Sequence, residues 1–331
     1  MIRIFATLAA LICMALPLHA RCAGVNLIDR LPAADRTALQ AATLRSPYPV
    51  GNYWRARRGQ QSVTLVGTYH FDDPRHADTM AALTPIIAAA RTVLVEAGPK
   101  EEAALQDHLA RDPGAMMIMT GPTLPEQLPE ADWQALAAAM RARGIPPFMA
   151  AKFQPWYVAA MLGIPPCAMA TAATSKGLDG MVIDAANLAA VPVSALEPYD
   201  TIFGMFGSMS NEDQLSMIKN TLMMEGYSTD FSVTLADTYF AQDTRLIWEF
   251  MRQQALKTPD YTPGQIDAEF DRMEEAMLSK RNRAWIPVLT DAAAKGPTFA
   301  AFGALHLSGQ DGVLALLERE GFTLERLMFA E

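Results

Sequence analysis

The sequence has few cysteines and no cluster of basic residues, and each of these absences excludes some classes of protein. Charged residues make up 19% of the 331 residues, and the formal net charge is −9. A chain with this charge is repelled by a phosphate backbone, so we expect no nucleic-acid partner. Three cysteines are present, and two of them, Cys22 and Cys167, could form a disulfide in an oxidising compartment. Their pairing stays open, because sequence does not fix the distance between them.

One long apolar run occurs at the N-terminus. Arg3 precedes the apolar residues 4–18, and the small residue Ala20 follows them. This order is typical of a secretory signal peptide, residues 1–20. The run is shorter than the ~20 residues that span a bilayer as a helix, so an uncleaved anchor is the less favoured alternative. We expect a periplasmic or secreted protein with no stable membrane insertion after cleavage.

The remaining residues, 21–331, predict a single α/β domain, because no repeat and no Gly-, Pro- or Ser-rich linker divides them. Residues 53–57 and 62–66 read as a hairpin. A helix at residues 79–90 then leads to an apolar strand at 92–95, which is the pattern of a parallel crossover. Strands are also predicted at 194–196, 298–302 and 322–327. The expected fold is a central mixed, largely parallel sheet flanked by helices.

A helix-dominated middle forms a predicted insertion. Its apolar spacing indicates helices at residues 211–224, 231–256 and 263–289. Methionine is abundant, with 20 residues, which is typical of a pliable apolar surface; copper binding by thioethers is the less favoured reading. We expect an apolar lid over the ligand-binding cleft, formed by Met205, Phe206, Met209, Met217, Met223 and Met224.

Two Gly-x-x-His motifs follow predicted strands. The strand at 62–66 runs into Gly67 and His70, and the strand at 298–302 runs into Gly303 and His306. Glu96 follows the strand at 92–95. Because the carboxyl ends of parallel strands share one crevice, we expect the two imidazoles and the carboxylate to meet there.

Two imidazoles and one carboxylate can hold a divalent metal and leave positions open for water and substrate. The predicted ligands are His70, Glu96 and His306, with Mn, Co or Zn as plausible ions. Glu96 would complete the metal shell or take a proton from the attacking water. The alternative is that each histidine only caps its strand through a backbone hydrogen bond. His76 and His108 lie outside the motifs and read as ordinary surface residues.

The chain resembles the TraB/GumN family, relatives of the Tiki proteases. The likeness rests on GTYH at residues 67–70, LVEAGP at 94–99 and FGALH at 302–306. KFQPW, GLDG, VPVSALE and RNRAW, at residues 152–156, 177–180, 191–197 and 281–285, support it. The resemblance implies an α/β fold and a metal-dependent peptidase site built from both histidines.

The resemblance also implies roles for residues outside the strand-end histidines. Arg281 and Asn282 match the family's helical Arg-Asn pair, and Arg281 would contact an anion or a developing oxyanion. Without the resemblance, surface ion pairing is the default for Arg281. Glu197 either lines the same crevice or caps the next helix. The Gln that usually follows this Glu in the family is missing, which indicates a divergent branch with a different substrate.

The sequence thus predicts an exported hydrolase that acts on a peptide or small-molecule substrate. One alternative is a non-catalytic binding protein that holds a peptide signal or a haem-like ligand in the same cleft. Another is a degenerate family member that stabilises a surface complex. The oligomeric state is not predicted.

Overall fold

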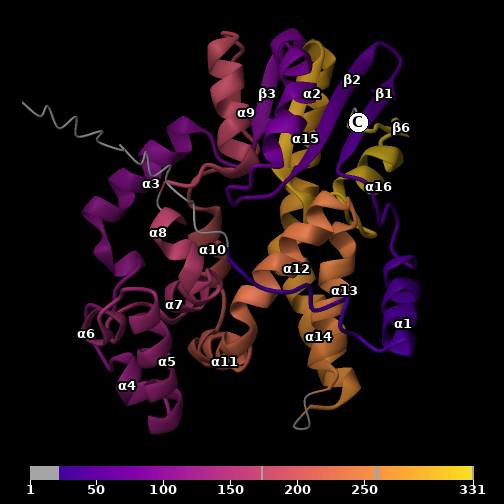
Figure 1. The fold of residues 1–331 in the computed structure, drawn as a ribbon. Coiled ribbons are helices and arrows are strands. Elements are labelled where there is room, and N and C mark those ends of the chain that lie inside the picture. The colour runs from indigo at the N-terminus through magenta and orange to yellow at the C-terminus, as the bar shows by residue number, and fades with distance from the viewer. Residues whose placement is uncertain (1–21, 173, 258–260, 330–331) are drawn as a thin grey trace, which may run out of the picture.

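The computed structural model describes residues 22–172, 174–257 and 261–329, so the expected signal peptide lies outside the described residues. A six-stranded sheet forms the centre, in the order β4-β3-β5-β2-β1-β6 (Figure 1). The strands are β1 (Tyr53–Arg58), β2 (Gln61–Thr68), β3 (Thr92–Val95), β4 (Val193–Ala195), β5 (Thr298–Gly303) and β6 (Thr323–Arg326). Strands β4, β3, β5 and β2 are parallel neighbours, and β1 is antiparallel to β2 and β6. The predicted α/β class and mostly parallel sheet are confirmed.

Helices cover both faces of the sheet and extend away from it. The helices that flank or precede the strands are α1 (Ala33–Thr43), α2 (His76–Ala89), α9 (Gly177–Leu188), α15 (Lys280–Lys295) and α16 (Val313–Arg319). The others are α3 (Pro99–Arg111), α4 (Leu124–Gln127), α5 (Glu130–Ala142), α6 (Pro147–Ala150), α7 (Pro155–Leu162), α8 (Met169–Ala172), α10 (Thr201–Gly207), α11 (Asn211–Met223), α12 (Ser228–Phe240), α13 (Thr244–Ala255) and α14 (Pro263–Glu274).

The central strand β5 is buried on both faces because its side chains alternate between two cores. Phe299 and Ala301 pack against α2 and α9, and Ala300 and Phe302 pack against α15 and α16. Alternate residues of a strand point to opposite faces, so an unbroken apolar run is required where helices cover both. This three-layer arrangement fixes the strand ends from which the site is built.

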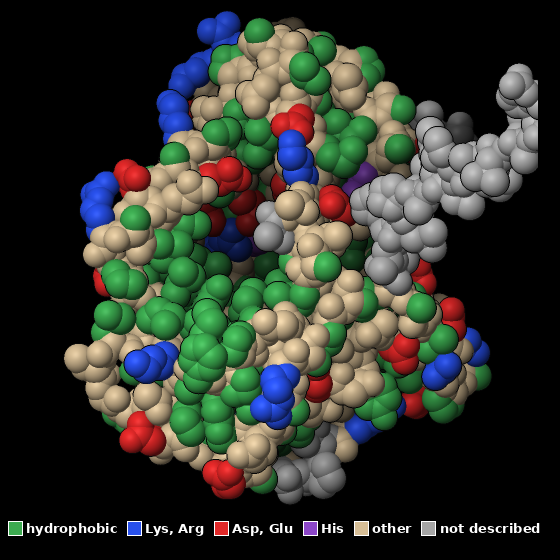
Figure 2. All heavy atoms as spheres, turned by 60° about the vertical axis from the view of Figure 1, so that its left-hand side comes forward, with side chains coloured by type: hydrophobic (Ala, Val, Ile, Leu, Met, Phe, Trp, Pro, Cys, Tyr) green, Lys and Arg blue, Asp and Glu red, His purple; other side chains and the backbone are tan. Residues whose placement is uncertain are grey.

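The helical insertion forms a third core below the sheet. Helix α11 packs on α5 and α7, and Ile218 of α11 is fully buried among them. The insertion faces the sheet across a hollow, and hydrophobic side chains line much of its lower wall (Figure 2). Within the described residues no single helix is long and apolar enough to span a membrane. One pair, Pro155–Leu162 and Pro166–Leu188, reaches the length together but is bent by 86°.

The helical segment after α11 differs from the sequence prediction. The single helix predicted over residues 231–256 is wrong: α12 ends at Phe240 and α13 begins at Thr244. Gln242 between them has a φ of +58°, which breaks the helical path.

The open question of whether the two cysteines pair is resolved, because Cys22 and Cys167 form a disulfide.

Candidate functional site

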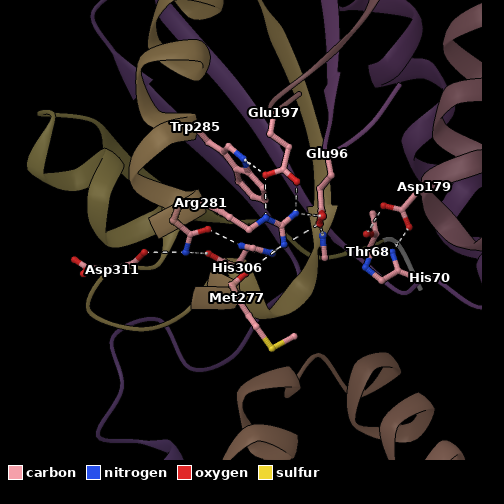
Figure 3. A network of polar contacts seen from close by, with 12 residues as sticks. Thr68, His70, Glu96, Asp179, Glu197, Met277, Arg281, Trp285, His306 and Asp311 are labelled. Atoms are coloured by element: carbon pink, nitrogen blue, oxygen red, sulfur yellow. Dashed lines mark hydrogen bonds and ion pairs between the residues drawn. The ribbon is translucent and has the colours of Figure 1, made fainter. Parts of the chain in front are cut away.

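Four neighbouring parallel strands each deliver one polar side chain to the same edge of the sheet. His70 follows β2, His306 follows β5, Glu96 follows β3 and Glu197 follows β4. The two motifs lie side by side because β2 and β5 are paired in register, with Thr68 opposite Gly303. Figure 3 shows Glu96, Glu197 and His306 around the guanidinium group of Arg281, with His70 on the far side of Glu96, where it pairs with Asp179. The expected meeting of both histidines with Glu96 is therefore present.

The two motif glycines serve different purposes. A Cβ on Gly67 would lie 2.7–2.8 Å from atoms of Ala304 and Leu307, so this glycine lets the motifs pack together. A Cβ on Gly303 would lie 3.1 Å from Nε2 of His70 and 3.2 Å from Oε1 of Glu96. Gly303 thus keeps open a space between two of the predicted metal ligands.

Helix α9 orients His70. Oδ2 of Asp179 lies 2.7 Å from Nδ1 of His70, and Thr68 donates to Oδ1 of the same carboxylate at 2.6 Å. This pairing keeps a proton on Nδ1, so Nε2 is the ring nitrogen that would bind a ligand. Gly177, with a φ of +51°, allows α9 to begin directly against the His70 backbone.

The charge of His70 is set by two opposing effects. Removal from bulk water lowers the pKa of His70, but the charge and hydrogen bond of Asp179 outweigh this and raise it to about 9. Because 58% of the side chain is exposed, water weakens both effects, and the direct Asp179 pair determines the direction. Without a metal, His70 is therefore a cation at neutral pH.

Helix α15 orients His306 in a different way. Nδ1 of His306 lies 2.6 Å from Oδ1 of Asn282, whose amide nitrogen donates to the carbonyl of Asp311 at 2.8 Å. An amide oxygen only accepts, so Nδ1 of His306 carries the proton and Nε2 keeps its lone pair. Burial lowers the pKa of His306 to about 3, so this ring is neutral at physiological pH.

Glu96 is held as an anion between the backbone and a cation. Its Oε1 accepts from the Gly303 N–H at 2.6 Å, and its Oε2 accepts from Nη2 of Arg281 at 2.6 Å. Burial alone would raise the pKa of Glu96, but the charges of His306, His70 and Arg281 and the Gly303 bond lower it to about 2. His306 is neutral near pH 7, so Arg281 and His70 supply the charge there.

Arg281 lies at the centre of the cluster. It donates from Nε and Nη2 to the two oxygens of Glu197, at 2.9 and 2.6 Å. Its Nη1 lies 3.2 Å from Nε2 of His306 and also donates to the carbonyl of Met277. Trp285 donates from Nε1 to Glu197 at 2.9 Å. The residues before α15, Glu275–Ser279, form a π-helical turn, a feature frequent at functional sites.

The structure therefore brings every sequence-predicted site residue into one cluster: His70, Glu96, Glu197, Arg281, Asn282 and His306. Sequence reasoning missed Asp179 and Thr68 as partners of His70. The prediction that His76 is an ordinary surface residue is wrong, because its side chain is buried against Tyr239 and Phe240. His108 is half-buried against Tyr199 and Phe203.

The donor chemistry of the cluster fits a divalent metal. Each histidine has its Nδ1–H held by a carboxylate or an amide, as is usual for metal-binding histidines, so Nε2 is the nitrogen that would bind an ion. Binding would displace the second proton of the His70 cation and the contact between Arg281 and His306. Gly303 leaves space between His70 and Glu96. Among the described residues, however, no three His, Cys, Asp or Glu side chains already close around one point. Nε2 of His306 lies 3.9 Å from Oε1 of Glu96.

Comparison with known proteins identifies one family. The TraB/PrgY/gumN family profile matches residues 52–326, which covers most of the chain and includes both motifs and the arginine helix. A search among curated proteins finds no match.

Proposed function

Because the chain belongs to the TraB/PrgY/gumN family, we propose that it is an exported hydrolase that uses a divalent metal held by His70, Glu96 and His306. The observation that carries the proposal is the pair of imidazoles beside one carboxylate, each with its Nδ1–H held by its own partner, so that Nε2 is the nitrogen that would bind the ion. A divalent ion held there would polarise a carbonyl and acidify water.

The protonation states of Glu96 and Arg281 indicate which role each residue would have. A general base works best when its pKa lies near the working pH, and the pKa of Glu96 is about 2. Glu96 is therefore suited to hold the metal, which is the first of the two roles predicted for it. Arg281 brings a positive charge to the same wall, where it would stabilise negative charge that develops on the substrate.

The surroundings support a peptide, ester or amide substrate in an oxidising compartment. The hollow beside the cluster has hydrophobic side chains along its lower wall, which suits an apolar substrate segment (Figure 2). The Cys22–Cys167 disulfide supports export, because disulfides persist in secreted and periplasmic proteins.

The test compares the purified mature protein with His70→Ala and His306→Ala variants. Elemental analysis measures bound metal, and a peptide library measures hydrolysis. We expect both histidine variants to lose metal and activity, while His108→Ala, which changes a histidine outside the cluster, retains metal. Unchanged metal content and hydrolysis in both variants would contradict the proposal. Peptide binding without turnover, or a Soret band on adding haem, would favour the binding-protein alternative.

A further inference from the structure

The Arg281 guanidinium lies where a metal ion would have to meet two of its three ligands. Nη1 is 3.2 Å from Nε2 of His306, and Nη2 is 2.6 Å from Oε2 of Glu96. The first contact uses the Nε2 lone pair that a metal needs, because Nδ1 of His306 is bonded to Asn282. A guanidinium N–H and a divalent ion cannot both use the one Nε2 lone pair of His306, and the two positive charges repel each other.

The edge of the site between His306 and Glu96 needs little rearrangement once the guanidinium leaves. Two ligand atoms at about 2.1 Å from a tetrahedral metal lie about 3.4 Å apart. His306 Nε2 and Glu96 Oε1 are separated by 3.9 Å, so this edge must close by about half an ångström.

Arg281 has other partners that can retain it after such a move. Glu197 binds it through two parallel hydrogen bonds, from Nε and Nη2, and the Met277 carbonyl accepts from Nη1 at 3.2 Å. Glu197 is itself fixed by the indole N–H of Trp285. A two-point contact of this kind is the strong form of an Arg–carboxylate pair.

On the basis of the proposed metal-dependent function, we propose that Arg281 is an internal placeholder for the metal. It neutralises Glu96 and caps His306 in the metal-free protein, and it withdraws toward Glu197 when the ion binds. Arg281 therefore opposes metal binding, and in the metal-free protein it gives two of the three proposed ligands, Glu96 and His306, a hydrogen-bonding partner.

The experiment measures Co²⁺ affinity, with no reference to turnover, by calorimetry and by visible absorbance on chelator-treated mature protein. The main variant is Arg281→Met combined with Glu197→Gln, which removes one charge of each sign and leaves the net charge unchanged. The matched control makes the same two chemical changes at exposed positions, Arg272→Met with Glu212→Gln. We expect the main variant to bind Co²⁺ about tenfold more tightly than the wild type, because a lost hydrogen bond to a charged group has that magnitude. The control should match the wild type.

The outcomes separate the two proposals. If the wild type binds Co²⁺ in a manner that needs His70 and His306 but the main variant binds no more tightly, the placeholder role is wrong and the proposed function stands. If no Co²⁺ binding depends on those histidines, both fail. Should the main variant not fold, Zn²⁺ added to the wild type must shift the Arg281 Nε–H signal in nitrogen-15 NMR spectra. An unchanged signal would overturn the placeholder role.

Discussion

Gly177→Ala should destabilise the protein strongly, because the added methyl group would collide with the backbone of His70. The residue has a φ of +51°, and an added Cβ would lie 2.4 Å from both the carbonyl carbon and oxygen of His70. The neighbouring N–H of Leu178 donates to the carbonyl of Tyr69 at 3.0 Å, so the two segments cannot simply separate. No side-chain rotation can relieve contacts that involve only backbone atoms.

The expected cost has two parts. A left-handed alanine costs about 1–2 kcal/mol, and overpacking at a rigid contact costs about 1–3 kcal/mol. We therefore expect a loss of about 2–5 kcal/mol in the free energy of unfolding. Urea unfolding measures this loss. The control is Gly204→Ala in α10, where no atom lies within 4 Å of the added methyl, and a gain of up to about 1 kcal/mol is expected. A Gly177→Ala protein within about 0.5 kcal/mol of wild type would refute the reasoning.

Three further predictions concern the site and the disulfide. Asp179→Asn should lower the NMR titration midpoint of His70 in the metal-free protein from about 9 toward the ordinary value of about 6.5. Because the pKa of His70 is raised in the folded protein, its pair with Asp179 stabilises the protein fully below pH of about 6.5 and progressively less as the pH rises through 9. The variant should lose this pH dependence of stability. A titration midpoint that does not move in the variant would count against the pair. Gly303→Ala should weaken Co²⁺ binding at least about tenfold, because the added methyl group fills the space between His70 and Glu96. Stability in urea should change little. Equal Co²⁺ affinity in the variant and the wild type would argue that the metal does not use this space. Replacing Cys22 and Cys167 by Ser removes the cross-link between residues 145 positions apart. The gain of chain entropy in the unfolded state should then lower the free energy of unfolding by about 5 kcal/mol. Equal unfolding midpoints for the variant and the wild type would exclude this effect.

The strands and their ends could be predicted from sequence because local chemistry determines them. Residues 298–302 are apolar throughout, as a strand covered on both faces requires, and the glycine and histidine that follow mark its end. The convergence of His70, Glu96 and His306 then follows from the common direction of parallel strands. These steps need only the order of residues along the chain.

The partners of those side chains could not be predicted in the same way. Asp179 lies 109 residues after His70, and a single carboxylate near a helix start reads as an ordinary first-turn charge. Arg281 stands in a charged helix whose sequence suggests surface pairs, although its actual partners are Glu96 and Glu197. The helix break at Gln242 could not be predicted, because no glycine or proline occurs between α12 and α13. Each of these depends on packing between distant segments.

The position of β5 in the sheet has a consequence for how the chain is made. This strand lies between β2 and β3, although it is synthesised some two hundred residues after both of them. Until residues 298–303 arrive, the earlier strands have no partner on their facing edges, and open edges of this kind invite intermolecular pairing. An incomplete chain therefore lacks His306 and exposes two unpaired strand edges. We expect chaperones to bind the growing polypeptide until its last tenth, which carries β5, has been made.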